Sequence, residues 1–438
     1  MRESWGKPML LNFTVSNFRS IRDEVTLSMS GGRYRETTEG SRAIKTGFAQ
    51  FPCALRAAAI YGANASGKSS VVGALEFLQR LVIHSARDES GNFLATLPVC
   101  KATSKTEKAQ TSLFEINFIE EDVQYTYGVV ASQDRIVEEW LHAKTKKGRT
   151  RELFSRALEG DEYDWHFSSY FNSKKMTSTW SKATRPNALF LSTAIQLNSN
   201  ELRPVHEWVT LRLRLVTPSN HLGHMVTSQH LVDEEKDYDA LLELVQAADP
   251  TITAINVEPN EVEENEFLSV FNEEIRARLL ENAVSRIDYD VRVTHKVPGC
   301  PEYSLDIEEE SDGTQIIYKY AAPFLQSLEH NFVVVVDELD RSLHPLLLER
   351  FVALFTEPND EKTEAQIIFT THDSALLSTD VIHRDQIWFV DNVGMKGSKL
   401  VPLSDFKPRK SDRLQKIYLQ GRYRAVPKPR TKMLFRAK

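Results

Sequence analysis

The chain has 438 residues, of which 41% are hydrophobic and 26% charged. This is the balance of a globular protein, and it excludes a disordered, collagen-like or coiled-coil chain. The length allows two or three domains, and the net charge of −7 argues against a chain coated with nucleic acid. The three cysteines lie far apart, and no run approaches the ~20 apolar residues of a membrane helix. We therefore expect a cytoplasmic protein with no membrane contact.

The charge is unevenly distributed along the chain. Residues 396–438 contain 14 Lys and Arg and only 2 Asp and Glu, which gives this tail a charge of +12. The rest of the chain then carries −19. An acidic body and a basic tail are therefore expected to present separate surfaces.

The first half of the chain is expected to consist mainly of strands. Apolar residues alternate with polar ones in two segments that predict a hairpin, and a compact apolar run before Gly62 predicts a buried strand followed by an amphipathic helix. Further on, antiparallel strands are expected and then a polar, loop-rich stretch. The hairpin is expected at residues 10–21 and 25–29, the buried strand at 57–61 and the amphipathic helix at 71–82. The antiparallel strands are expected at 111–142 and the loop-rich stretch at 144–182.

The second half alternates helices with strands. Helices are expected at 202–215, 239–247, 315–329 and 345–355, a solvated helical surface at the Glu-rich 256–283, and strands at 332–336, 366–370 and 386–390. A continuous run such as Val333-Val-Val-Val336 is typical of a parallel strand covered on both faces. The alternation predicts an α/β fold whose last strand ends near Val390, which leaves the basic tail outside the sheet.

Gly62-Ala-Asn-Ala-Ser-Gly-Lys-Ser69 matches the phosphate loop G-x-x-x-x-G-K-[ST] in full. Its glycines let backbone N–H groups surround an anion, Lys68 would reach the β- and γ-phosphates of ATP, and the Ser69 hydroxyl would bind Mg²⁺. The expected nucleotide contacts are Gly62, Ala63, Asn64, Ala65, Ser66, Gly67, Lys68, Ser69 and Ser70. The alternative is a glycine-rich structural turn, but the preceding strand and the following helix favour a nucleotide site.

Two acids follow the second buried strand. Asp337 at the end of this strand is expected to hold Mg²⁺, and Glu338 to act as the catalytic base or to position the attacking water. The alternative is a strand end with two solvated acids. An intact phosphate loop elsewhere in the chain favours the catalytic interpretation.

Several strings together carry a resemblance to a known family. They are Asn17-Phe-Arg-Ser-Ile21, the phosphate loop, Asp337-Glu-Leu-Asp-Arg-Ser-Leu-His-Pro345, Thr370-Thr-His-Asp373 and Tyr418-Leu-Gln-Gly-Arg-Tyr423. The chain resembles the ABC-type ATPases of the recombination, repair and SMC superfamily. More narrowly, it is similar to the RloA-like AAA-family ATPases of bacterial anti-phage and abortive-infection loci. The resemblance implies a P-loop NTPase of ABC-ATPase type, with a mixed or parallel sheet and an inserted helical and β subdomain.

The resemblance also implies roles for further residues. Asp340 would lie at the interface of an ATP-bound homodimer, and His372 would contact the γ-phosphate as a switch histidine. Ser311 and Gly313, in Ser311-Asp-Gly-Thr-Gln315, stand where the signature motif belongs and would bind the γ-phosphate held by the other subunit. This string departs from the Leu-Ser-Gly-Gly-Gln of transporters, so a plain helix cap is the alternative.

Two weaker assignments complete the expected site. Gln196 would link Mg²⁺ to the helical part, although other glutamines compete for this role. Arg19 would reach the nucleotide from the first hairpin, or else lie exposed on the surface.

The expected organisation has five parts. They are an amino-terminal ATPase lobe at 9–83, a β-rich part at 84–200, a helical and acidic insertion at 201–300, a carboxy-terminal lobe with the signature, Asp337 and His372 at 301–393, and the basic tail at 394–438. Only 66 residues follow His372, and no glutamate is among them. We therefore expect no built-in metal-dependent nuclease.

The hypothesis that follows is an anti-phage switch ATPase that dimerises on ATP and controls a separately encoded effector, such as a nuclease or toxin. The alternative is a repair ATPase that binds DNA or RNA through the basic tail and the loop Lys144-Thr-Lys-Lys-Gly-Arg-Thr-Arg151. A transporter subunit is disfavoured by the long insertion after Val71 and by the altered signature.

Overall fold

The computed structural model describes residues 8–31, 42–101, 111–216, 223–261, 287–357, 363–392, 394, 397–409 and 411–426. The chain divides into two units. The first comprises residues 1–217, 327–340 and 348–438, and the second comprises residues 218–326 and 341–347.

The first unit contains a six-stranded sheet in the order β11-β15-β16-β5-β17-β18. Five neighbouring strands are parallel, and β18 pairs antiparallel with β17 at one edge. The bounds are β5 Ala57–Gly62, β11 Leu213–Val216, β15 Val333–Val336, β16 Gln366–Thr371, β17 Ile387–Asn392 and β18 Ser398–Pro402. All residues of β5, β15 and β16 are buried, as the apolar sequence of parallel strands predicts.

The first unit also contains a seven-stranded antiparallel sheet, in the order β10-β9-β8-β7-β6-β1-β2. Its strands are β1 Met9–Ser16, β2 Val25–Ser28, β6 Ser112–Glu120, β7 Val123–Ala131, β8 Ile136–Thr145, β9 Arg151–Glu159 and β10 Glu162–Phe167. A separate hairpin pairs β3 Ala43–Phe48 with β4 Phe51–Leu55.

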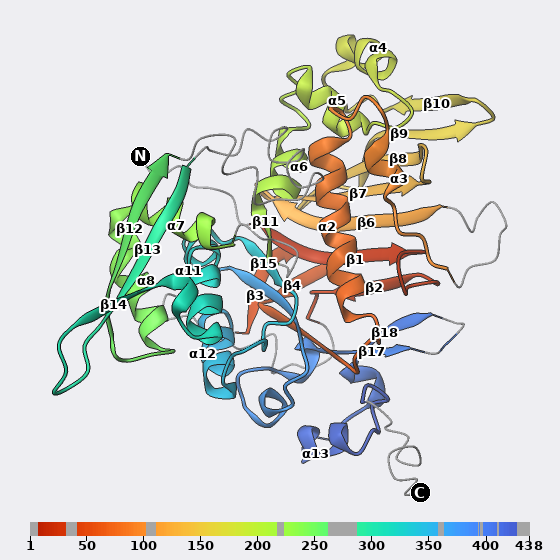
Figure 1. Ribbon diagram of the computed structural model, residues 1–438. Helices are drawn as coiled ribbons and strands as arrows, with labels where there is room; N and C mark the ends of the chain where they lie inside the picture. Colours follow the sequence, from red (N-terminus) through yellow and green to blue (C-terminus); the bar gives the residue numbers. More distant parts are fainter. Residues whose placement is uncertain are drawn as a thin grey trace, which may run out of the picture. The chain divides into compact units, whose positions relative to one another are not determined.

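Helix α2 joins the two sheets into one core. It runs from Lys68 to His84 and crosses the seven-stranded sheet (Figure 1). Phe77 of α2 stacks on Phe114 of β6 with ring centroids 5.4 Å apart, while other α2 residues share a buried cluster with Ile60 and Val335 of the parallel sheet. The remaining helices of the unit are α3 Asn92–Ala95, α4 Lys174–Ala183, α5 Phe190–Gln196, α6 Arg203–Glu207, η2 Trp208–Arg212, α12 Pro345–Thr356, η5 Ala375–Ser378, η6 Arg384–Gln386, η8 Leu403–Phe406 and α13 Leu414–Leu419.

The second unit contains the three-stranded antiparallel sheet β12-β13-β14 with helices beside it. The elements are α7 Gly223–Asp233, η3 Glu235–Asp237, α8 Tyr238–Gln246, β12 Ile252–Glu261, β13 Ile287–His295, β14 Tyr303–Asp306, η4 Ile307–Glu309 and α11 Asp312–His330. The chain therefore has an α/β fold, in which the second unit of helices and antiparallel strands is inserted in the sequence between segments of the first.

Four sequence-based expectations about local structure are wrong. The stretch 144–182 is not mainly loop, since it contains β9, β10 and α4. The expected helix 202–215 is α6 followed by a π-helix and strand β11, which pairs with β15. Residues 256–261 are strand rather than helix, and most of the Glu-rich segment lies outside the described residues. The sheet does not end near Val390, because β18 extends it into the basic tail.

Candidate functional site

The phosphate loop connects β5 to α2 through a tight turn. Gly67 has a φ of 107°, a left-handed conformation that favours glycine, and Ala65 also has a positive φ of 60°. A Cβ on Gly62 would overlap the side chain of Ser66. The two glycines of the motif are therefore needed to close the loop.

The amino-terminal end of α2 is open to an anion. Gly67 is the N-cap and offers no side-chain hydrogen bond to the first turn, so the free N–H groups of this 17-residue helix can bind phosphate oxygens. The hydroxyl of Ser66 is buried and has no partner among the described atoms. Ser69 is exposed, while Ser70 is buried and its Oγ lies 2.8 Å from Ser20 Oγ.

Lys68 lies over this loop. Its Nζ donates to the carbonyl oxygens of Gly62 at 2.8 Å and Ala63 at 3.2 Å. Burial lowers the pKa of the Lys68 ammonium group, although Asp340 and Asp337 nearby act in the opposite direction. The positive charge is thus held at the mouth of the loop.

The acidic part of the site follows β15. Asp337 is 8% exposed, and its Oδ1 accepts a hydrogen bond of 2.6 Å from the hydroxyl of Thr370. The same hydroxyl accepts a hydrogen bond of 2.7 Å from the backbone N–H of Glu338. Glu338 has a positive φ of 57°. Thr370 therefore fixes both acids, a role that the sequence reasoning missed although Thr370 belongs to the quoted string Thr370-Thr-His-Asp373.

His372, just past β16, brings the two halves of the site together. Its backbone N–H donates to Asp340 Oδ2 at 2.9 Å, and its Nδ1 lies 3.4 Å from Lys68 Nζ. Burial first and the charge of Lys68 second lower the pKa of the imidazole. Asp340 Oδ1 is buried without a partner among the described atoms. Lys68, Asp337, Glu338, Asp340 and His372 thus surround one place at the ends of β5, β15 and β16.

The two weaker assignments differ in position. Arg19 reaches the loop, since its Nη1 donates to the carbonyl of Ser69 at 3.3 Å and its guanidinium covers Gly73 so closely that a Cβ there would overlap it. Gln196 is exposed at the end of α5. No hydrogen bond from Gln196 to the phosphate loop or to Asp337 is present in the described structure.

Ser311 and Gly313 belong to the second unit. Ser311 Oγ accepts a hydrogen bond from the N–H of Thr314 at 3.2 Å, so this serine caps α11. A Cβ on Gly313 would lie 3.2 Å from the carbonyl oxygen of Ser342, which leaves little space for a larger residue. Ser311 therefore forms the helix cap that was the alternative interpretation. A capping serine at a helix amino terminus can also bind an anion.

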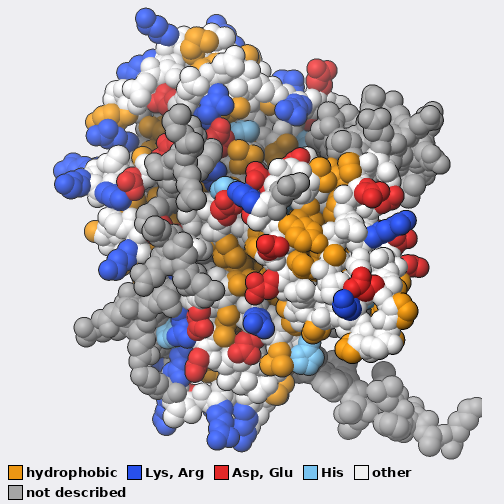
Figure 2. Space-filling model, turned by 90° about the vertical axis from the view of Figure 1, so that its left-hand side faces the viewer, with side chains coloured by type: hydrophobic (Ala, Val, Ile, Leu, Met, Phe, Trp, Pro, Cys, Tyr) orange, Lys and Arg blue, Asp and Glu red, His pale blue; other side chains and the backbone are white. Residues whose placement is uncertain are grey.

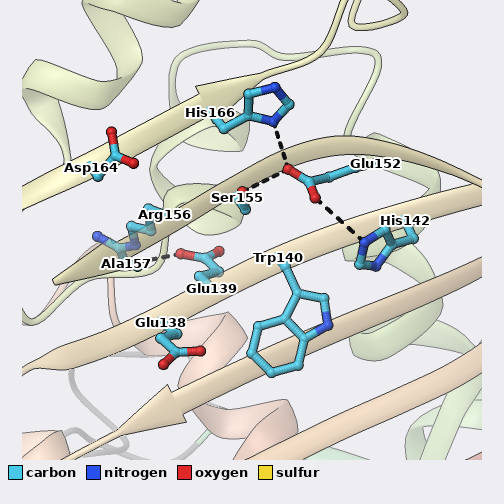
Figure 3. A pocket seen from close by; sticks show the side chains of 10 residues that line it. All are labelled: Glu138, Glu139, Trp140, His142, Glu152, Ser155, Arg156, Ala157, Asp164 and His166. Carbon is cyan, nitrogen blue, oxygen red and sulfur yellow. Dashed lines mark hydrogen bonds and ion pairs between the residues drawn. The ribbon is translucent and has the colours of Figure 1, made fainter.

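A separate pocket of about 340 Å³ lies on the face of β8, β9 and β10 (Figure 3). Glu152 lies at its centre, bonded to His166 Nδ1 at 2.6 Å and to Ser155 Oγ at 2.7 Å. Hydrogen bonds from Ser155 and His166 lower the pKa of this carboxyl. The central acid is already satisfied by its neighbours, so this pocket does not compete with the phosphate loop as the nucleotide site.

The residues at the phosphate loop fit a Mg²⁺–nucleotide. Magnesium is usually held by one or two carboxylates together with substrate phosphates rather than by a protein cage. The described residues contain no group of three or more His, Cys, Asp or Glu that could hold a metal ion. Asp337 and the exposed Ser69 would supply one carboxylate and one hydroxyl, and Ser66 of the same loop has a buried hydroxyl without a partner among the described atoms.

The family model described as "AAA domain, putative AbiEii toxin, Type IV TA system" matches residues 57–378. The chain belongs to this AAA family. The match begins at β5 and ends at η5, so it includes the phosphate loop, Asp337, Glu338 and His372. The chain is therefore an AAA-type ATPase. Among curated protein sequences, none matches the chain.

Solved structures with similarity to this ATPase include an SMC head domain from Thermotoga maritima, at 13% identity and a TM-score of 0.40, covering 90% of this chain and 98% of that one. An SMC head domain bound to the C-terminal domain of ScpA, from Pyrococcus furiosus, has 14% identity and a TM-score of 0.38, covering 95% and 100%. The recombination mediator protein RecF has 12% identity and a TM-score of 0.32, covering 91% and 99%. Similarity of this size says nothing about substrates or partners.

No helix among the described residues is both long and apolar enough to cross a membrane.

Proposed function

We propose that this protein hydrolyses ATP with Mg²⁺ and uses the reaction as a conformational switch. The observation that carries the proposal is that Lys68 and His372 contact each other at the phosphate loop, where the charges of Asp337 and Glu338 also act on Lys68. A cation, a metal-binding acid and a second acid are the groups that phosphoryl transfer requires.

Each residue has a distinct proposed role. Lys68 and the amino terminus of α2 bind the phosphates, and Arg19 supports the first turn of that helix. Asp337 and Ser69 would hold Mg²⁺, which neutralises phosphate charge when bound. Glu338 positions or deprotonates the attacking water, and the His372 imidazole donates a hydrogen bond to the γ-phosphate as negative charge develops.

The proposed switch is a homodimer that closes on ATP. Ser311 and Gly313, at the amino terminus of α11, would reach the γ-phosphate held by the partner subunit. Asp340 would lie at the interface.

The proposed biological setting is anti-phage defence, with a separately encoded toxic effector such as a nuclease under control of the switch. The support is the family description, which names a putative toxin of a toxin–antitoxin system, together with the specific string around Asp337. Expressing the chain with and without its neighbouring reading frames, and counting phage plaques, tests this. Protection by the chain alone would contradict control of an effector in trans.

Nucleic-acid binding is the competing function. Figure 2 shows Lys and Arg side chains mixed with Asp and Glu, so the described side chains on that face form no continuous basic surface. Truncation after Val426 removes five basic residues and leaves β18 and α13 intact. A steep salt dependence of DNA affinity that this truncation abolishes would favour the competing function.

Glu338→Gln tests the ATPase site. The variant should bind ATP, lose turnover by at least about a hundredfold, and accumulate as an ATP-bound dimer in size-exclusion chromatography. Glu162→Gln, at an exposed position of β10, is the matched control and should turn over ATP normally. Normal turnover by Glu338→Gln would overturn the assignment of this glutamate.

A further inference from the structure

The first residue of β18 contacts the back of the phosphate loop. Ser398 is 3% exposed, and its hydroxyl donates to the carbonyl oxygen of Ser66 at 2.6 Å. A backbone carbonyl can only accept, so the direction of this bond is fixed. The two residues are 332 positions apart in the chain, and the bond joins the carboxy-terminal segment directly to the nucleotide site.

Ser398 is itself held by Ser20, in the turn that follows β1. The backbone N–H of Ser398 donates to the carbonyl of Ser20 at 2.7 Å, and the two side-chain oxygens lie 2.8 Å apart. Ser20 Oγ is also 2.8 Å from Ser70 Oγ in the first turn of α2. Three hydroxyls, those of Ser398, Ser20 and Ser70, therefore form a connected cluster behind the loop, which we call the serine cluster.

Two glycines make room for the serine cluster. A Cβ on Gly67 would overlap the hydroxyls of both Ser398 and Ser20. A Cβ on Gly397, whose φ is 74°, would lie 2.8 Å from the carbonyl oxygen of Ser20. The close approach of the tail to the phosphate loop thus requires glycine, which has no side chain, both at Gly67 in the loop and at Gly397 in the tail.

The bond to Ser66 has a consequence for the next residue. A trans peptide unit is planar, and its C=O and N–H point in opposite directions. Since the carbonyl of Ser66 is drawn toward Ser398, the N–H of Gly67 in the same peptide unit points away from the serine cluster. A phosphate that accepts from this N–H would therefore approach from the side opposite the serine cluster.

We propose that Ser398 is a positioning residue for nucleotide binding. It acts through the Ser66–Gly67 peptide unit, which it holds in the phosphate-binding orientation, and it does not touch the nucleotide itself. The inference rests on the proposed nucleotide site and assigns to the carboxy-terminal segment a direct role in it. Ligands or truncations that displace β18 should then alter ATP affinity.

Ser398→Ala is the test, with MgATP binding measured by titration calorimetry. Loss of one hydrogen bond that orders the loop should weaken MgATP affinity about 3- to 10-fold, with KM raised and kcat nearly unchanged. Ser398→Thr, which keeps the hydroxyl, should restore affinity. Ser404→Ala, in the neighbouring η8, is the matched control and should bind as the wild-type protein does.

Coupling within the cluster provides a second readout that a general loss of stability would not imitate. If Ser20 and Ser398 act together, Ser20→Ala combined with Ser398→Ala should weaken MgATP binding by less than the product of the single effects. Wild-type affinity in Ser398→Ala, or independent effects of the two substitutions, would overturn the inference and leave the proposed function intact. Absence of MgATP binding by the wild-type protein would instead overturn the proposed function.

Discussion

Lys68 Nζ lies 3.4 Å from His372 Nδ1, so the lysine of the phosphate loop and the histidine after β16 share one hydrogen bond. An ammonium group can only donate, and Nδ1 must therefore accept, which requires an imidazole without a proton on that nitrogen. The lowered pKa of His372 agrees with this arrangement. A γ-phosphate reaching Lys68 would compete for this bond and would favour a protonated imidazole.

The first prediction concerns the titration of His372. Its pKa in the nucleotide-free protein should be below the ordinary 6.5, and it should rise when Lys68 is replaced by Met. The fold disfavours the protonated imidazole, so the unfolded chain takes up a proton on His372 at a higher pH than the folded protein does. The free energy of unfolding should therefore decrease as the pH falls below about 6.5. NMR titration of labelled histidines measures the pKa, with Lys399→Met as the control, and an unchanged pKa in Lys68→Met would contradict the prediction.

The second prediction concerns Thr370, which is fully buried and bonds both Asp337 and Glu338. Thr370→Val removes the hydroxyl and keeps the shape. It should lower the free energy of unfolding by about 1–3 kcal/mol and reduce kcat at least about tenfold, because it leaves a buried carboxylate short of a donor. Chemical denaturation and steady-state ATPase assays measure the two effects.

Thr356→Val is the matched control for Thr370. Thr356 is also fully buried, but its hydroxyl bonds the carbonyl of Val352 within α12. This variant should retain kcat. An equal loss of kcat in both variants would show that the effect of Thr370→Val is not specific to the site.

The sequence predicts the parts of the site that depend on local patterns. The strand–loop–helix around Lys68 and the buried run before Asp337 are short segments whose composition alone indicates their structure, and both are found where expected. Ser398 could not be found in this way, because its partner Ser20 is 378 residues away and a lone serine carries no signal. Strand β18, Ser-Lys-Leu-Val-Pro, is short and partly polar, so its place in the sheet depends on pairing with β17 rather than on its own sequence.

The third prediction concerns the buried pair of Glu120 and Arg212. Glu120 Oε1 lies 3.4 Å from Arg212 Nη2, but burial dominates and raises the pKa of Glu120 to about 7. A raised carboxyl pKa means that the folded state binds more protons than the unfolded chain between about pH 4.5 and 7. Stability should therefore decrease as the pH rises through this window.

Glu120→Gln should remove this pH dependence and make the protein more stable than the wild type above pH 7. Thermal unfolding followed by circular dichroism between pH 5 and 8 measures the change. Glu159→Gln, at an exposed position at the end of β9, is the control and should keep the wild-type slope. A Glu120→Gln variant with an unchanged slope would show that another group titrates in this range.

The fourth prediction concerns Glu139 of β8, which lies beside Arg156 (Figure 3) and organises the start of α5. Its side chain is fully buried, pairs with Arg156 at 2.9 Å, and accepts hydrogen bonds from the N–H groups of Phe190 at 2.7 Å and Leu191 at 3.0 Å. Glu139→Ala leaves the Arg156 cation buried without its carboxylate and α5 without its cap, which should cost about 3–5 kcal/mol. Glu138→Ala changes the adjacent, exposed residue of the same strand and should cost little. If denaturant unfolding gave equal losses for the two variants, the stability of this region would not depend on the buried pair, and α5 would have to be held by its apolar contacts alone.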